Sequence, residues 1–156
     1  MLIKMLTVLT FLIICAWITY IDIRKQKIYN GAVAALLVPA IVSFFVFSEI
    51  NPLSRVLGAI SVSGMMLLIS LIKPGSFGGG DVKLMVAVGL FLGLERALWA
   101  GILAVFVAGV WLLLSIVHKV VYKVYKIQPK TWLREKLPFG PALCMGAVLS
   151  LFLMSI

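Results

Sequence analysis

The chain has 156 residues, of which 63% are hydrophobic and 12% charged, and its mean hydropathy is +1.20. This composition excludes an ordinary soluble domain, because soluble domains are about 45–50% apolar and about 25% charged. The formal net charge of +9 arises from Lys and Arg residues between the apolar runs, which favours anionic lipid over nucleic acid as a partner. We expect one integral-membrane domain over residues 1–156.

Six apolar runs follow one another along the chain and predict an all-α polytopic membrane protein with about six transmembrane helices. The runs are continuously apolar and do not alternate as membrane β-strands do. The fourth is short: a helix from Val82 to Leu94 extends about 20 Å against a hydrocarbon thickness of about 30 Å. The predicted helices cover residues 5–21, 31–48, 56–72, 84–94, 97–117 and 137–156.

Basic residues predict the orientation of these helices. Loops 22–30, 73–83 and 118–136 carry most of the Lys and Arg residues, which places these loops in the cytoplasm and both termini outside. In the last loop the lysines recur at helical spacing, so we expect an amphipathic extension that lies in the lipid interface. The opposite side receives three cations, which are Lys4, Arg55 and Arg96.

Only two aspartates occur in the chain, and both lie at predicted cytoplasmic helix ends. Asp22 follows the first apolar run, and Asp81 precedes the fourth. Ionisable groups in membrane segments are costly, which makes a functional role the default hypothesis. Two carboxylates brought together disfavour double ionisation and share one proton, so one can activate a water while the other polarises a peptide carbonyl.

Three glycines, Gly78, Gly79 and Gly80, stand directly before Asp81. We expect them to form non-helical backbone recessed below the cytoplasmic surface, where such backbone must line a wet cavity or be buried in protein. Backbone without Cβ atoms admits another chain closely, and an extended peptide can pair with it by strand addition.

No metal ion and no organic cofactor is predicted. Cys15 and Cys144 lie in separate apolar runs without a C-x-x-C pattern, and the single histidine, His118, stands in a basic segment. We interpret the two cysteines as packing residues.

The sequence GGGD at 78–81 resembles the G-x-G-D signature of intramembrane aspartyl proteases. Three segments resemble the type IV prepilin peptidases specifically: Asp22 with the basic residues and IYN that follow it, GGGDVKLM at 78–85, and PFGPAL at 138–143. Their order, together with the six-helix layout, covers nearly the whole chain. One departure is Tyr29, where the family usually has proline, which predicts a looser turn after the first helix.

The resemblance implies an aspartic endopeptidase of the prokaryotic cytoplasmic membrane, which removes the basic leader of prepilin-like substrates on the cytoplasmic side. Asp22 and Asp81 would be its catalytic pair. The chain starts at the first peptidase helix and lacks the cysteine pairs of longer members, so it resembles the short form of tight-adherence (Flp-type) pili, for which N-methylation is not expected. The resemblance implies supporting or substrate-binding roles for Gly78, Gly79, Gly80, Lys83, Asn30, Gly140 and Pro141.

The main alternative is a small transporter or channel subunit in which the two aspartates relay a proton or a cation. Both carboxylates lie on one predicted side, however, and no polar residue marks a path to the other side. A presenilin-like protease would share G-x-G-D but not the IYN and PFGP segments.

Overall fold

The computed structural model describes the backbone of residues 1–124 and 139–153 and the side chains of residues 1–118 and 139–153. This part of the chain contains helices and no strand, which confirms the all-α prediction. Each helix coincides with one predicted apolar run. The helices are α1 (Leu2–Lys25), α2 (Asn30–Val46), α3 (Pro52–Ile72), α4 (Gly79–Leu92), α5 (Leu94–Val124) and α6 (Phe139–Leu153).

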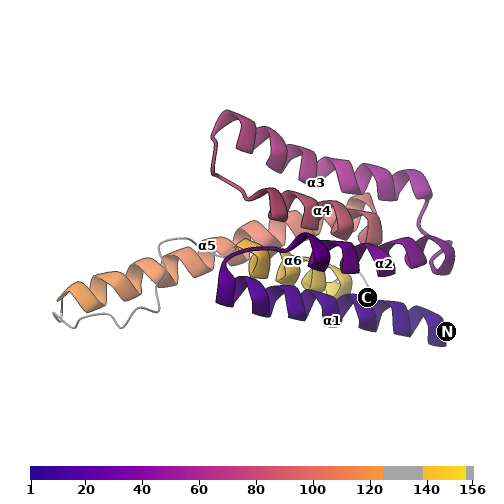
Figure 1. Ribbon diagram of the computed structural model, residues 1–156, viewed down its shortest axis with the longest axis horizontal. Coiled ribbons are helices and arrows are strands. Elements are labelled where there is room, and N and C mark those ends of the chain that lie inside the picture. The colour runs from indigo at the N-terminus through magenta and orange to yellow at the C-terminus, as the bar shows by residue number, and fades with distance from the viewer. Residues whose placement is uncertain (125–138, 154–156) are drawn as a thin grey trace.

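The first five helices run alternately in opposite directions, and α6 lies against α1 and α5 (Figure 1). The α1–α2 turn and the α3–α4 loop lie at one end of the bundle, which brings Asp22 and Asp81 to the same end, as predicted. α4 packs against α2, α3, α5 and α6, and is the central helix. α5 continues as a helix to Val124, and the rest of the predicted amphipathic segment 118–136 lies outside the described residues.

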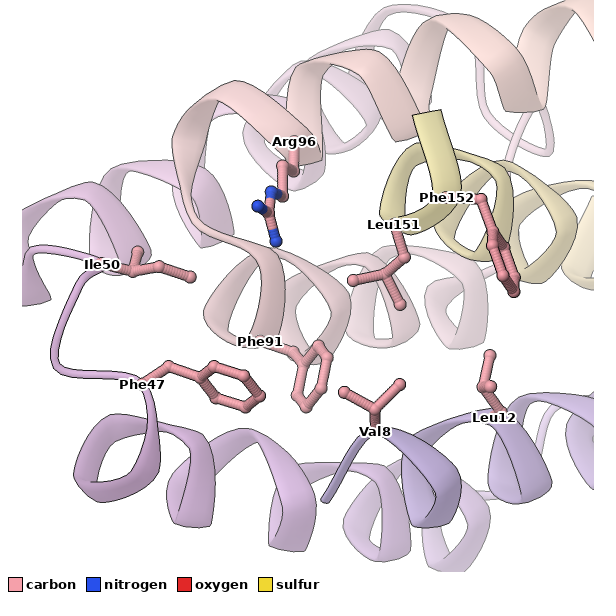
Figure 2. A pocket seen from close by; sticks show the side chains of 8 residues that line it. All are labelled: Val8, Leu12, Phe47, Ile50, Phe91, Arg96, Leu151 and Phe152. Carbon is pink, nitrogen blue, oxygen red and sulfur yellow. The ribbon is translucent and has the colours of Figure 1, made fainter. Parts of the chain in front are cut away.

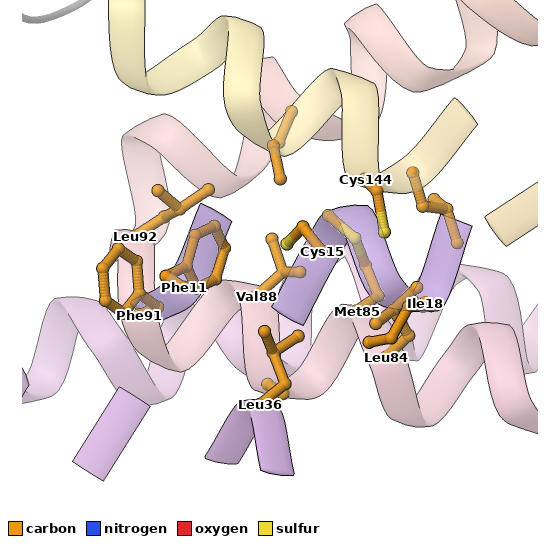
Figure 3. Packing of buried hydrophobic residues seen from close by; sticks show 14 of the residues in the cluster. Phe11, Cys15, Ile18, Leu36, Leu84, Met85, Val88, Phe91, Leu92 and Cys144 are labelled. Carbon is orange, nitrogen blue, oxygen red and sulfur yellow. The ribbon is translucent and has the colours of Figure 1, made fainter. Parts of the chain in front are cut away.

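Buried apolar side chains fill the space around α4 (Figure 3). Val88 of α4 is fully enclosed, and Phe91 stacks on Phe11 of α1 with ring centroids 4.1 Å apart. Cys15 and Cys144 are free thiols inside this cluster, which agrees with a packing role. Large apolar side chains are exposed on the outer faces of the helices, where lipid is the natural solvent.

Among the described residues, three helices are long and apolar enough to cross a membrane: α1, α3, and α5 as far as His118. α2 and α6 are shorter apolar helices of 17 and 15 residues. α4 has 14 residues and is therefore about 21 Å long, against about 30 Å of hydrocarbon. The architecture fits a polytopic membrane protein whose number of spans stays a prediction.

The start of α3 differs from its prediction. The helix begins at Pro52, four residues earlier than expected, because Asn51 accepts the Leu53 amide at 3.0 Å and proline suits the first helical position. Arg55, expected among the cations of the opposite side, therefore lies inside α3 and is fully buried.

Arg55 ties α3 to the ends of two neighbouring helices. Its guanidinium donates to the hydroxyl and the carbonyl of Ser43 at 2.6 and 3.0 Å and to the Phe47 carbonyl at 2.9 Å, at the end of α2. It also donates to the carbonyls of Leu90 and Phe91 at 3.2 and 3.3 Å, at the end of α4. The last carbonyls of a helix have no partner within the helix, so one buried side chain satisfies both ends.

The start of α4 corrects a second expectation. Gly79 and Gly80 are the first two residues of the helix, not non-helical backbone, and Gly78 is the extended residue before it. The Asp81 carboxylate explains the early start, because it accepts the Gly78 amide at 3.0 Å and lies at the positive end of the helix dipole.

A cavity of about 220 Å³ lies at the end of the bundle away from the aspartates, between α1, α4, α5 and α6 (Figure 2). Its lining is apolar except for Arg96, which extends into it from α5. None of the described residues that line this cavity is acidic, so they do not offer the paired acid and base that hydrolysis requires.

Candidate active site

A larger cavity of about 730 Å³ lies at the aspartate end of the bundle. Its walls come from the end of α1 and the turn after it, the α3–α4 loop, and the first residues of α4 and α6. Asp22 and Asp81 both line it, so the fold brings together the two carboxylates singled out in the sequence. The other lining residues are Gln26, Lys27, Ile28, Gly75, Ser76, Phe77, Gly78, Gly79, Gly80 and Phe139.

Asp22 lies in the last turn of α1 and is only 4% exposed. Its Oδ2 atom accepts the backbone amide of Gly140, the second residue of α6, at 3.1 Å. A Cβ atom at position 140 would lie 2.7 Å from that oxygen, so only glycine leaves room for this contact. The helix ends just beyond, where Gln26 adopts a left-handed conformation. The backbone N–H of Gln26 donates a hydrogen bond to the backbone carbonyl of Asp22 at 2.7 Å.

Asp81 lies on the opposite wall, in the first turn of α4, and is half-buried. The backbone amide of Gly78, in the same turn, donates a hydrogen bond to the Oδ2 atom of Asp81. Each aspartate therefore receives a hydrogen bond from a backbone amide, Asp22 from another helix and Asp81 from its own cap. Both carboxylates have a fixed orientation, and water-accessible space lies between their helices.

The three glycines have different surroundings. A Cβ atom at Gly80 would lie 2.8 Å from the Cβ atom of Ile28 in the α1–α2 turn, so this glycine lets the start of α4 pack against that turn. At Gly79 a Cβ atom would meet nothing within 4 Å. Gly78 contributes the amide that holds Asp81. The sequence predicted one non-helical run that another chain could approach, whereas the packing requires glycine most clearly at position 80.

The other residues with predicted supporting roles do not line the cavity: Lys83, Asn30, Gly140 and Pro141. Lys83 donates to the Oδ1 atom of Asn30 at 3.1 Å, which joins the first turns of α4 and α2. Pro141 is buried at the start of α6.

Sequence reasoning missed several lining residues, most clearly Phe77 and Phe139. Their rings meet edge to face with centroids 5.1 Å apart, at the rim of the cavity. Phe139 lies within the PFGPAL segment and Phe77 directly before the glycines, so position beside the two motifs was the available signal.

The model of the type IV leader peptidase family matches residues 9–113. The matched stretch contains both aspartates and all three glycines, and it ends before PFGPAL. Searches among curated proteins and among solved structures gave no match. Because the matched stretch covers well over half of the sequence, the chain belongs to the type IV leader peptidase family.

Proposed function

We propose that the chain is an aspartic endopeptidase that removes the basic leader of type IV prepilin-like substrates at the cytoplasmic face of the membrane. The observation that carries the proposal is the presence of Asp22 and Asp81 in one cavity, beside the glycine run. Membership of the type IV leader peptidase family supports a peptidase activity. Among the described residues that line the cavity, Asp22 and Asp81 are the only acidic ones. In this proposal the chain does not N-methylate its product.

In the proposed reaction the two aspartates share one proton. The ionised carboxylate takes a proton from a water molecule, whose oxygen forms a bond to the scissile carbonyl carbon. The protonated carboxyl donates a hydrogen bond to the carbonyl oxygen, which accepts the developing negative charge. The C–N bond then breaks as the leaving amine takes up a proton. Either aspartate can begin as the base, and the amides of Gly140 and Gly78 hold both in orientation.

We propose further that the six helices span or enter the cytoplasmic membrane with the aspartate end inside the cell and both termini outside. The charge distribution supports this orientation, because the described part of the opposite end carries Lys4, Arg96 and the buried Arg55, fewer cations than the three loops of the aspartate end. The basic loops at the aspartate end would contact anionic lipid headgroups.

Reporter fusions test this orientation. Fusions after Lys27, after Gly79 and within 123–130 should report the cytoplasm, and fusions near Pro52 and Glu95 should report the outside. A cytoplasmic signal near Pro52 would overturn the six-helix topology.

Cleavage of a co-expressed prepilin-like protein in membranes tests the activity. The wild-type chain should shorten it, and mass spectrometry should place the new N-terminus after a small residue at the cytoplasmic edge of its apolar helix. Asp22→Asn and Asp81→Asn should each lower the cleavage rate by about a thousandfold or more, because each removes one proton-transfer role.

Two controls sharpen this experiment. Glu95→Gln should cleave like the wild type, because Glu95 is exposed and does not line the aspartate cavity. Neither a metal chelator nor the omission of S-adenosylmethionine should alter the rate. Loss of cleavage with the chelator, or normal cleavage by Asp22→Asn, would contradict the aspartic mechanism.

A further inference from the structure

An apolar groove of about 340 Å³ runs between α3 on one side and α5 and α6 on the other. Its lining is apolar apart from one serine hydroxyl. Several lining side chains are strongly exposed, with exposed fractions of 63% for Met65, 59% for Ile102 and 66% for Val105. The groove therefore faces the lipid along two helices that are long enough to cross a membrane.

The groove continues the aspartate cavity. Phe77 and Phe139, the aromatic pair at the rim, line both spaces. From that pair the groove follows α3 from Ile69 back to Ser61, a distance of about 12 Å at about 1.5 Å per residue. It therefore leads from the carboxylates toward the middle of the bilayer.

We propose that this groove holds one face of the substrate's apolar helix while the scissile bond lies between Asp22 and Asp81. The proposal rests on the proposed function, which gives the substrate a leader in the cytoplasm and an apolar helix directly after the cleaved bond. A peptide of that kind must leave the aspartate cavity and enter lipid, and the groove joins the two. Its binding mode would be a helix in a groove, with apolar anchors at i, i+3 or i+4, and i+7.

The other apolar cavity that reaches Phe139 is a poorer exit. It lies between α5 and α6, measures about 40 Å³, and does not include Phe77. Gly101 faces Val62, and a Cβ atom there would lie 3.1 Å from the valine methyl, so α3 and α5 meet closely at this point and close the floor of the groove. The volume of about 340 Å³ on the α3–α5 side, against about 40 Å³ between α5 and α6, leaves more room for large substrate side chains.

Bulky substitutions at the rim of the groove test the proposal. Met65→Trp and Ile102→Trp should fill it without disturbing the core, because both side chains are exposed. We expect the KM for a membrane-inserted prepilin-like substrate to rise about tenfold, with kcat near the wild-type value, since only binding is affected. Leu67→Trp and Phe106→Trp are matched controls: both residues are exposed, with fractions of 50% and 70%, and neither lines the groove. Equal KM values for all four variants would overturn the proposal.

Photocrosslinking separates this proposal from the proposed function. A photoreactive p-benzoylphenylalanine replaces Met65, or Leu67 as control, in the Asp81→Asn background, so that binding is read without cleavage. An adduct with the substrate's apolar helix from position 65, and none from position 67, is the expected result. Adducts with lipid alone at position 65 would overturn the groove assignment even if the wild-type chain cleaves. A substrate adduct with a wild-type chain that does not cleave would retain the groove and refute the peptidase mechanism.

Discussion

The two ends of α4 are held in opposite ways. At the C-terminal end, the buried Arg55 guanidinium satisfies the carbonyls of Leu90 and Phe91, and Gly89 packs directly on the backbone of α3. At the N-terminal end, Asp81 lies beside a large cavity and is held by an amide of its own turn. The difference shows how a helix too short to span the bilayer can present a carboxylate. Its C-terminal end is buried against neighbouring helices, and its N-terminal end packs against the α1–α2 turn at Gly80 and lines the cavity.

The largest expected effect concerns the cavity end. Gly140→Ala should lower the cleavage rate about a hundredfold, because the new methyl group would lie 2.7 Å from Asp22 Oδ2 and displace the carboxylate. The measurement is the initial cleavage rate per folded protein in membranes. Gly109→Ala is the control, since a Cβ atom at Gly109 in α5 would meet nothing within 4 Å. An unchanged rate for Gly140→Ala would show that the Gly140 contact does not orient Asp22 for the reaction.

A substitution at the C-terminal end of α4 should change the stability of the folded protein. Arg55→Met should lower the free energy of unfolding in detergent by about 3 kcal/mol, because buried carbonyls of two helices lose their donor. Arg55→Lys should recover only a small part, since an ammonium cannot reproduce the planar fork that reaches both helices. Thermal unfolding followed by circular dichroism gives the comparison. A full recovery by lysine would mean that the charge, and not the geometry, holds the end of α4.

Two neighbouring glycines at the N-terminal end of α4 allow a matched comparison of substitutions. Gly80→Ala should reduce cleavage about tenfold, because its Cβ atom would collide with Ile28 and shift the first turn of α4. Gly79→Ala should cleave at nearly the wild-type rate, since open space surrounds that position. Equal losses from both substitutions would indicate that backbone freedom of the run, and not packing, is required.

The smallest expected effect concerns the bridge between Lys83 and Asn30. Lys83→Met should lower the free energy of unfolding by about 0.5–1 kcal/mol, because it removes one hydrogen bond between exposed side chains. A double-mutant cycle with Asn30→Ala isolates the interaction between the two residues. A loss of cleavage with Lys83→Met that Asn30→Ala does not reproduce would assign Lys83 a role beyond this bridge.

The sequence predicted the helices because lipid-facing and core-facing positions are both apolar, so each helix appears as a continuous run. It also predicted that Asp22 and Asp81 lie at the same end of the bundle. Asp22 follows the first helix and Asp81 precedes the fourth, and helices that alternate in direction bring these two positions to one side. The start of α3 was predicted four residues too late, although Asn before Pro is a common helix start, so Arg55 was not expected inside a helix. The Gly140 contact could not be worked out from spacing, since it depends on how α6 packs against α1.

The hydrogen bond between Gly140 and Asp22 also has a consequence for the order of folding. The hydrogen bond from Gly140 to Asp22 joins residues 118 positions apart, so its donor is synthesised long after its acceptor. A growing chain that has released only its first five helices carries both aspartates but lacks the amide that orients one of them. The candidate site is therefore complete only after α6 has packed against α1.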